Sequence, residues 1–499
     1  MRGTRSAFKN VSRDIRMFIG DRDIQLVVQK LEERAKNLPN FSYEFFHVGH
    51  ELKAIFWADD VSKVNYQMFG DVLGFDATYS TNKCVTFSAG LIDSETIESY
   101  QWLLSAFLKI HVREPLLVLT DQDPAMRVAV PLVFKKAFHR LCMWHIMKKL
   151  SSKICSDLLA NSTLRSSIHK LVWNIYISPS TFEERWINLM FQFNVGDHVW
   201  LSEMFAIRDL WVPAYFRDTP MSCLMKTTSR CESSNALFKV NSTAENTLVQ
   251  FMMCFDTAID NQCYNQRILE FQTSNSRPDL RCGLDIEAHA SEIYTHSVFK
   301  DVQKEIFKGM MNCFIFDVDV VDQSKVFTIS HMDHNMDFVN EFKVSAHMHD
   351  NSVECTCIGF SRIGYLCRHI FCMLRVMKVK EIPDRYVAKH WRRQILPCLL
   401  YSISNRLAAD DSKESILKNQ AMNCVSDCVD KLTGSFEFLS AFVDKMKDIK
   451  KYVFDENPGV SNLRKRAVAI EDLLGNVYDT TVLFTPPQGI QNKGCGTHL

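Results

Sequence analysis

Metal-binding side chains lie close together in the second half of the chain, in Cys355-Thr356-Cys357 and Cys367-Arg368-His369. Three sulfurs and one imidazole form a complete tetrahedral set for zinc, with bonds of about 2.3 Å to sulfur and about 2.0–2.1 Å to nitrogen. Four protein ligands leave no position for water, so the metal would be structural rather than catalytic. This set constrains the fold strongly, because two separate segments must meet at one ion.

The spacing of these ligands predicts a strand, a hairpin and a helix closed around zinc. Alternate residues of a strand face the same side, so Cys355 and Cys357 can share one ion, while Gly359 and Gly364 let the chain turn back. A helical pattern follows the second pair, at Ile370, Phe371, Leu374 and Met377. The alternative is a set of unrelated buried thiols and a core histidine. Cys372, one turn further on, is interpreted as a packing residue or a substitute ligand.

Composition sets the broad class of the protein. A chain of 499 residues with 46% hydrophobic content is expected to form two or three domains with real cores. Lys+Arg and Asp+Glu are both 58, so any nucleic-acid surface must be local. We find no export signal and no run of about 18 apolar residues, which favours a soluble intracellular protein. In that setting the 17 cysteines are expected to be reduced, with some serving as metal ligands.

Two predicted strands each end in a carboxylate. The first ends at Asp76, and the second is followed directly by Asp121. Together with Glu232, in the first turn of a predicted helix, they could form a two-metal site that holds Mg²⁺ for phosphodiester cleavage. Asp123 competes with Asp121 for the second role. With 58 acidic residues in the chain, a chance occurrence of acids at strand ends is an open alternative.

Cys142 and His145 form a third candidate, because residues three apart on a helix share a face. Two ligands do not close a zinc site, so a buried thiol beside a hydrogen-bonded histidine is the main interpretation. Helical patterning dominates from Met126 to about Phe216. The tryptophans along that segment are interpreted as core residues.

Several of these residues lie in longer motifs that follow one another in a characteristic order. They are FGDVLGFDATYSTNK (69–83), LTDQDPAM (119–126), HRLCMWHIMK (139–148), WVPAYF (211–216), TSRCESSNALF (228–238) and the final CxC-x9-CxH element. From about residue 45 to residue 395, the chain resembles a Mutator-like transposase core followed by a SWIM zinc finger. More narrowly, it resembles the plant far-red impaired response family of transposase-derived transcription regulators.

The resemblance implies an α/β fold, with a ribonuclease H-like transposase core containing a helical insertion, a small α+β SWIM-type zinc module and a helical C-terminal region. The expected segments are a helical lead-in (1–60), the transposase domain (61–250, insertion at about 150–225), a helical connector (251–311), the SWIM region (312–395) and a helical, partly disordered tail (396–499). Matched by position, the transposase acids are Asp76, Asp121 and Glu232, and the zinc ligands are Cys355, Cys357, Cys367 and His369.

Two departures from the family pattern bear on function. The family usually carries an N-terminal zinc-binding, DNA-contacting domain, and residues 1–60 do not supply its ligands. Around residues 82–90 the sequence is also shorter by about one strand, next to the strand that ends at Asp76. Loss of that strand would disturb the spacing of the acids, and catalysis tolerates misplacement poorly. The acids are therefore expected to be vestigial, and the protein is expected not to be an enzyme.

The local charge is positive where the total charge is zero. Between Cys355 and Arg393 there are nine Lys or Arg and two acids, a balance of 9 − 2 = +7. Such a patch can bind phosphates with salt-sensitive, sequence-independent affinity. A solvated helix face and a protein-binding surface are the alternatives. The candidate DNA contacts are Arg362, Arg368, Arg375, Lys378, Lys380, Arg392 and Arg393.

These observations lead to one main hypothesis, a nuclear zinc-binding transcription regulator that acts through DNA or protein partners in the light-responsive control of plant genes. The runner-up is a Mg²⁺-dependent transposase or nuclease. A third hypothesis is an adaptor that works only with full-length relatives. Zinc is the expected cofactor, with Mg²⁺ only if the acid site is active. The expected partners are DNA, related regulators or both, and the chain could form homo- or hetero-oligomers. No association with a membrane is expected.

Overall fold

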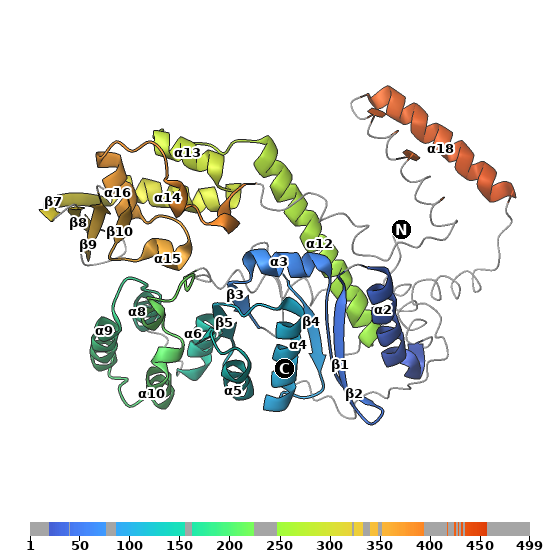
Figure 1. Ribbon diagram of the computed structural model, residues 1–499, viewed down its shortest axis with the longest axis horizontal. Coiled ribbons are helices and arrows are strands. Elements are labelled where there is room, and N and C mark those ends of the chain that lie inside the picture. The colour runs from blue at the N-terminus through green and yellow to red at the C-terminus, as the bar shows by residue number, and fades with distance from the viewer. Residues whose placement is uncertain are drawn as a thin grey trace.

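The computed structural model describes residues 19–38, 40–75, 86–154, 162–223, 247–321, 324–332, 340–347, 352–393 and 435–456, with a few single residues between 417 and 432. The described chain is a mixed α/β fold with three sheets (Figure 1). A long helix, α12 (Leu248–Asn275), runs from the sheet nearest the N-terminus toward the zinc-ligand region (Figure 1).

The first sheet is antiparallel and has the order β1-β2-β4. Its strands are β1 (Ser42–Val48), β2 (Glu51–Ala58) and β4 (Ala89–Ile92). Both faces of β2 are buried, with Trp57 in the core shared with α12 and Phe56 in the core shared with α4. The predicted helical lead-in over residues 1–60 therefore contains two strands of a sheet in addition to α2 (Asp23–Asn37), because the apolar residues of β2 serve two cores.

The second sheet is parallel and has the order β3-β5-β6. Its strands are β3 (Val72–Gly74), β5 (Leu117–Thr120) and β6 (Phe138–Leu141). The helices α3 (Asp60–Phe69), α4 (Ile97–His111) and α5 (Pro124–Val133) accompany these strands. All four residues of β5 are buried, as its apolar sequence predicts. No pairing joins β4 to β3 among the described strands, and the region of the expected missing strand lies largely at 76–85, outside them.

Within the described residues, the segment predicted to be helical from Met126 to about Phe216 contains the strand β6 in addition to α5 and four further helices that share one apolar core. They are α6 (Met143–Lys153), α8 (Ser162–Val172), α9 (Pro179–Gln192) and α10 (Val199–Ala206). Trp186 and Trp211 are buried in this core, and Trp173 and Trp200 pack against it. The interpretation as core residues is confirmed for these four tryptophans, whereas Trp144 is half-buried and packs against His145 and Lys148.

The third sheet is antiparallel, has the order β10-β9-β8-β7 and follows two helices, α13 (Asp285–Ile293) and α14 (His296–Met311). Its strands are β7 (Cys313–Val321), β8 (Ser324–His331), β9 (Asn340–His347) and β10 (Val353–Cys355). The helices thus end at Met311, and the antiparallel sheet leads directly to Cys355. We call residues 312–393 the zinc module.

Helix α12 is fixed at its N-terminus by a carboxylate from another helix. The backbone amides of Leu248 and Val249 donate to the two oxygens of Asp23 on α2, at 2.6 and 2.9 Å. Thr247 and Gln250 add a reciprocal capping box at the same end. Burial raises the pKa of Asp23, and the amide hydrogen bonds partly offset that increase. The start of α12 is therefore tied to α2.

One helix, α18 (Phe436–Glu456), lies in the predicted helical tail and stands apart from the other labelled elements in Figure 1. Among the described residues, no helix combines the length and the apolar character that a membrane crossing requires.

We predict that His111 makes the fold sensitive to acid. Its side chain is 1% exposed, contacts Tyr66 and Phe107, and neither ring nitrogen has a hydrogen-bond partner among the described residues. Burial lowers the pKa of His111 to about 4. Because the unfolded chain takes up the proton at a pH near 6.5, stability present above that pH is lost as the pH falls toward 4.

The variant His111→Phe is therefore expected to be more stable than the wild type at pH 5, by about 2 kcal/mol at a slope of about 1.4 kcal/mol per pH unit. Urea unfolding at pH 7 and pH 5 measures the difference. His50→Phe, at an exposed position, is the control and is expected to leave the acid sensitivity unchanged. An equal loss of stability in His111→Phe and wild type on acidification would contradict the prediction.

Candidate metal centre

The four candidate ligands come from the end of a strand, a turn and the start of a helix. Cys355 is the last residue of β10, and Cys357 lies in the turn that follows. Cys367 is the N-cap residue of α16 (Arg368–Val376), and His369 lies in its first turn. The prediction that the second pair starts a helix is confirmed.

The turn between the two ligand pairs differs from the predicted hairpin. Ile358 adopts a left-handed conformation with φ of 52°, and its amide donates to the carbonyl of Cys355 at 2.8 Å. The short helix α15 (Gly359–Ile363) follows. Cys357 therefore faces the cluster because the backbone turns after Cys355, and not because the two residues alternate on one strand.

Glycine is required at position 359 because its backbone lies close to the side chains of Cys357 and Cys367. A Cβ atom there would lie 2.7 Å from Cβ of Cys367 and 3.3 Å from Sγ of Cys357. The first distance is shorter than van der Waals contact allows, so any larger side chain would push the ligand pairs apart.

The ligand atoms of Cys355, Cys357, Cys367 and His369 all lie within 4.8 Å of one another. Ligands bonded to one zinc ion at about 2.0–2.3 Å in a tetrahedron are separated by about 3.5–3.8 Å, so the cluster fits with small movements. Cys357, Cys367 and His369 are buried, and Cys355 is half-buried. Among the residues that the structure describes, this is the one group of three or more side chains suited to a metal.

The electrostatics of the three thiols also suit a cation. The Cys357 sulfur accepts hydrogen bonds from the thiols of Cys355 and Cys367, which hold its pKa well below the usual range. The hydrogen bond to Cys357 raises the pKa of Cys355, and burial raises that of Cys367. Without a metal the cluster thus favours one thiolate, whereas a bound dication stabilises several thiolates at once.

The histidine ring is held by residues outside the ligand set. His369 places Nδ1 3.6 Å from Sγ of Cys355, and its Nε2 lies 3.4 Å from Nδ1 of His331 on β8. Phe342 on β9 stacks on the ring, with 4.0 Å between ring centroids. These contacts fix the orientation of the ring, as partners of metal-binding histidines commonly do.

Arg368 supports this arrangement and is not a surface residue. Its Nη1 lies 3.0 Å from Nε2 of His331, while Nε and Nη2 donate to the carboxylate of Glu305 on α14 at 3.0 and 2.7 Å. Glu305 also accepts the backbone amide of Arg368 at 3.0 Å, which caps α16. Sequence reasoning did not find His331 and Glu305, because their distant positions in the chain carry no spacing signal.

The prediction of DNA contacts is wrong for Arg362 and Arg368. Their exposed fractions are 1% and 6%, and the guanidinium groups are turned toward the protein interior. Arg375, Lys378 and Lys380 are exposed at and after the end of α16.

Two further candidates for DNA contact, Arg392 and Arg393, are half-buried and engaged within the protein. Arg392 pairs with Asp384 at 2.6 Å. Arg393 donates to the carbonyls of Ser291 and Ser276 at 3.1 and 3.0 Å.

Of the three predicted acids, only Asp121 lies within the described residues. It is exposed, directly follows β5, and accepts the amide of Asp123 at 3.1 Å. Asp123 caps α5 by accepting the amide of Met126 at 2.8 Å, so its carboxylate has a structural role. Asp76 and Glu232 lie outside the described residues. Their convergence with Asp121 therefore stays a prediction.

Cys142 and His145 lie together at the start of α6, where Cys142 is the N-cap residue. Burial raises the pKa of Cys142, but hydrogen bonding with His145 outweighs it and leaves that pKa below the usual value. Within the described chain no third metal-binding side chain joins them. The arrangement is that of a histidine-paired thiol.

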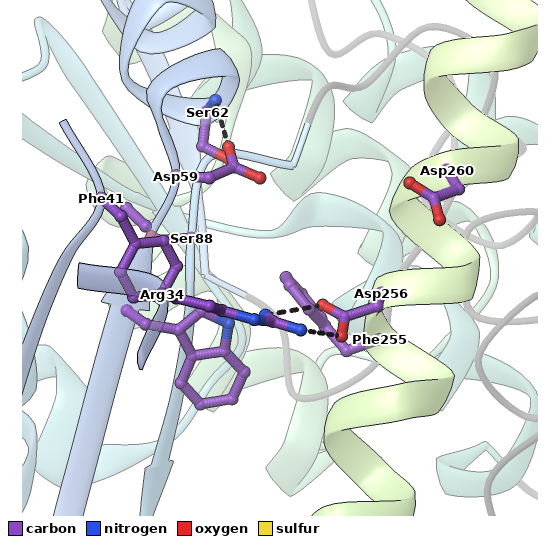
Figure 2. A pocket seen from close by; sticks show the side chains of 10 residues that line it. Arg34, Phe41, Asp59, Ser62, Ser88, Phe255, Asp256 and Asp260 are labelled. Carbon is purple, nitrogen blue, oxygen red and sulfur yellow. Dashed lines mark hydrogen bonds and ion pairs between the residues drawn. The ribbon is translucent and has the colours of Figure 1, made fainter. Parts of the chain in front are cut away.

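Figure 2 shows a small pocket between α2, the end of β2 and α12. Arg34 on α2 pairs with both carboxylate oxygens of Asp256 on α12, at 3.1 and 2.5 Å. Asp59 caps α3 by accepting the amide of Ser62 at 2.7 Å. The cavity volume of about 20 Å³ is enough for one water molecule. The pocket is thus a packing junction and too small for an organic ligand.

Comparison with known proteins identifies the class to which part of the chain belongs. Residues 67–149, which hold β3, β5 and β6, match the MULE transposase domain. No solved structure matches the chain.

The relatives of the full chain are plant proteins. It is 29% identical to Protein FAR1-RELATED SEQUENCE 5 of Arabidopsis thaliana over 84% of this chain and 56% of that protein. It is 30% identical to Protein FAR1-RELATED SEQUENCE 6 over 71% of this chain and 53% of that protein. Protein FAR-RED IMPAIRED RESPONSE 1 is 24% identical over 74% of this chain and 46% of its own length.

The chain thus contains a MULE transposase domain and is homologous to the FAR1-related proteins over most of its length. The resemblance inferred from the sequence motifs is confirmed. The chain spans about half of the length of these relatives.

We predict that the purified protein binds about one zinc ion per chain and that Cys367→Ser loses it. Zinc binding is coupled to folding at such sites. The variant should therefore lose about 4 kcal/mol or more of unfolding free energy at zinc concentrations a thousandfold above the dissociation constant. Metal analysis and urea unfolding measure the two effects. Cys372→Ser is the matched control, since Cys372 is a buried thiol of the same helix outside the cluster. Equal zinc content in both variants would rule out this ligand set.

Proposed function

We propose that this protein is a nuclear zinc-binding transcription regulator derived from a Mutator-like transposase, acting through DNA or protein partners in light-responsive control of plant gene expression. The observation that carries the proposal is the buried Cys3His cluster in a chain homologous to the FAR1-related proteins. In this proposal, residues 61–250 are a ribonuclease H-like transposase domain. Residues 312–395 are a SWIM-type zinc finger that holds a binding surface in shape.

The exposed part of the basic segment is the proposed contact with DNA. Arg375, Lys378 and Lys380 project from the end of α16 and the loop after it. Lys380 also pairs with Asp285 at 3.1 Å, but both side chains are exposed, so the pair is weak and open to competition by phosphate. Arg375 donates from Nη1 to the carbonyl of Met310 at 3.2 Å but remains exposed, so Arg375 and Lys378 are the first residues to test for phosphate contact.

We predict that the double variant Arg375→Gln, Lys378→Gln weakens binding to short duplex DNA of any sequence. Each lost phosphate contact should reduce the slope of log affinity against log salt by about 0.9. Fluorescence anisotropy at several salt concentrations measures this slope. The double variant Arg165→Gln, Lys170→Gln removes one exposed arginine and one exposed lysine from α8, so it is the charge-matched control and should change little. An unchanged slope in the double variant would argue for a protein partner at this surface.

A second candidate function, a Mg²⁺-dependent transposase or nuclease, is favoured by one observation. β3 and β5 pair in parallel with Gly74 opposite Leu119, so both strands point their carboxyl ends to one edge, where Asp121 is exposed. Asp76 follows the first of these strands in the sequence, and Glu232 would complete the site. The shorter sequence beside Asp76 supports the inactive alternative, which we prefer.

We therefore predict no nicking of terminal-repeat DNA by the wild-type protein in Mg²⁺ or Mn²⁺. Gel analysis of supercoiled plasmid carrying the repeats measures the activity. Metal-dependent nicking that disappears in Asp121→Asn, and persists in the exposed control Asp209→Asn, would instead establish the enzyme.

A further inference from the structure

The helical region that follows the parallel sheet (residues 143–223) directly contacts the zinc-binding turn, by which we mean residues 355–367. Two backbone amides, of Met221 and Cys223, donate to the carbonyls of Ser361 and Arg362 on α15, at 2.9 and 3.0 Å. These two hydrogen bonds join segments that are about 140 residues apart in the sequence. The turn that carries the metal ligands is therefore paired with the chain segment 217–223.

One contact reaches the peptide between two candidate ligands. Arg217 donates from Nη2 to the carbonyl of Thr356 at 2.5 Å, and Thr356 separates Cys355 from Cys357. A charged donor at this carbonyl gives a stronger hydrogen bond than a neutral one. Arg217 thus holds the backbone position on which the spacing of the two sulfurs depends.

A second contact reaches the histidine. The ring of Tyr176, from the loop between α8 and α9, packs edge-on against His369 and His331, with centroids 6.3 and 6.0 Å apart. It also meets Phe342 at 5.7 Å, so Tyr176 contacts three rings of the zinc module, including that of His369. Tyr176 packs against the core of the zinc module although it lies in the helical region.

Two buried arginines support this contact, one from the zinc module and one from the parallel sheet. Arg362 on α15 donates to the carbonyl of Ile175, and Arg140 on β6 donates to that of Ser222 at 2.7 Å. Their exposed fractions are 1% and 3%. Removing a guanidinium group from water is costly, so the bond from Arg362 holds only while the zinc module stays docked, whereas Arg140 fixes the segment 217–223 to the parallel sheet. The contact is thus sensitive to the shape of the zinc-binding turn.

We propose that the zinc site is completed by the helical region, with Tyr176 and Arg217 acting as positioning residues, so that zinc binding and docking of the zinc module stabilise each other. The inference rests on zinc binding at the Cys3His cluster, which is part of the proposed function. Reciprocity follows from linkage, because a contact that raises zinc affinity by some factor is itself strengthened by zinc by the same factor.

The first experiment measures zinc affinity of the full chain by competition with a chromophoric chelator. Tyr176→Ala and Arg217→Gln are each expected to weaken zinc binding by about 10-fold to 100-fold, the range seen for residues that orient metal ligands. The matched controls are Tyr264→Ala on α12 and Arg165→Gln on α8, both exposed and on helices outside the zinc module. These controls should keep wild-type affinity.

The second experiment follows amide hydrogen exchange in the wild-type chain before and after zinc removal by a chelator. The amides of Met221 and Cys223 are expected to exchange at least about tenfold faster without zinc, whereas the amides of α4 should not change. This measurement does not depend on whether the variants fold.

The outcomes separate the two proposals. A chain that binds no zinc overturns both the proposed function and this inference. Unchanged zinc affinity in both variants, together with faster exchange confined to residues 313–393, overturns only the inference that the helical region completes the site. Weaker zinc binding in the variants and faster exchange at residues 221 and 223 support it.

Discussion

Much of the second half of the described fold depends on holding three sulfur atoms and one imidazole together away from water. The ligands arrive from β10, from the turn at Ile358 and from the first turn of α16, so no single element forms the site. The close approach at Gly359 and the salt bridge between Arg368 and Glu305 then fix the two pairs relative to α14. Because Cys355 and Cys367 resist ionisation beside the Cys357 thiolate, a dication is the natural partner that stabilises all three sulfurs as thiolates.

The positive charge of the zinc module is divided between two roles. Arg362 and Arg368 are directed inward, where Arg362 donates to one carbonyl and Arg368 binds the carboxylate of Glu305 through two nitrogens. Removing these two from the nine basic residues between 355 and 393 leaves seven against two acids, a balance of +5. When arginines are buried and hydrogen-bonded inside the protein, the net charge of a segment therefore overstates the positive electrostatic potential at its surface. The lysines, which carry a strongly hydrated ammonium group, remain outside.

Local patterns in the sequence predicted the positions of helices and strands. The residues that surround the metal ligands come from distant parts of the sequence and were not predicted. The alternation in β8 and β9, the end of α14 at Met311 and the start of α16 after Cys367 follow from short-range periodicity and are seen in the structure. The roles of His331, Glu305 and Tyr176 could not be predicted, because each meets His369 or Arg368 from a different part of the chain. Similarly, β2 was expected to belong to a lead-in, since only its tertiary partners show that both of its faces are buried.

The length of α12 sets a geometric relation between the two ends of the molecule. Its 28 residues give a straight span of about 42 Å at about 1.5 Å per residue. Asp23 and the Arg34–Asp256 pair clamp one end to α2, while the other end leads into α13 and α14. Over this length, a small change in tilt at the clamped end corresponds to a larger displacement at the far end. A tilt of about 1° at the clamp displaces the far end by about 0.7 Å over such a span, which is comparable to the tolerance of a metal site.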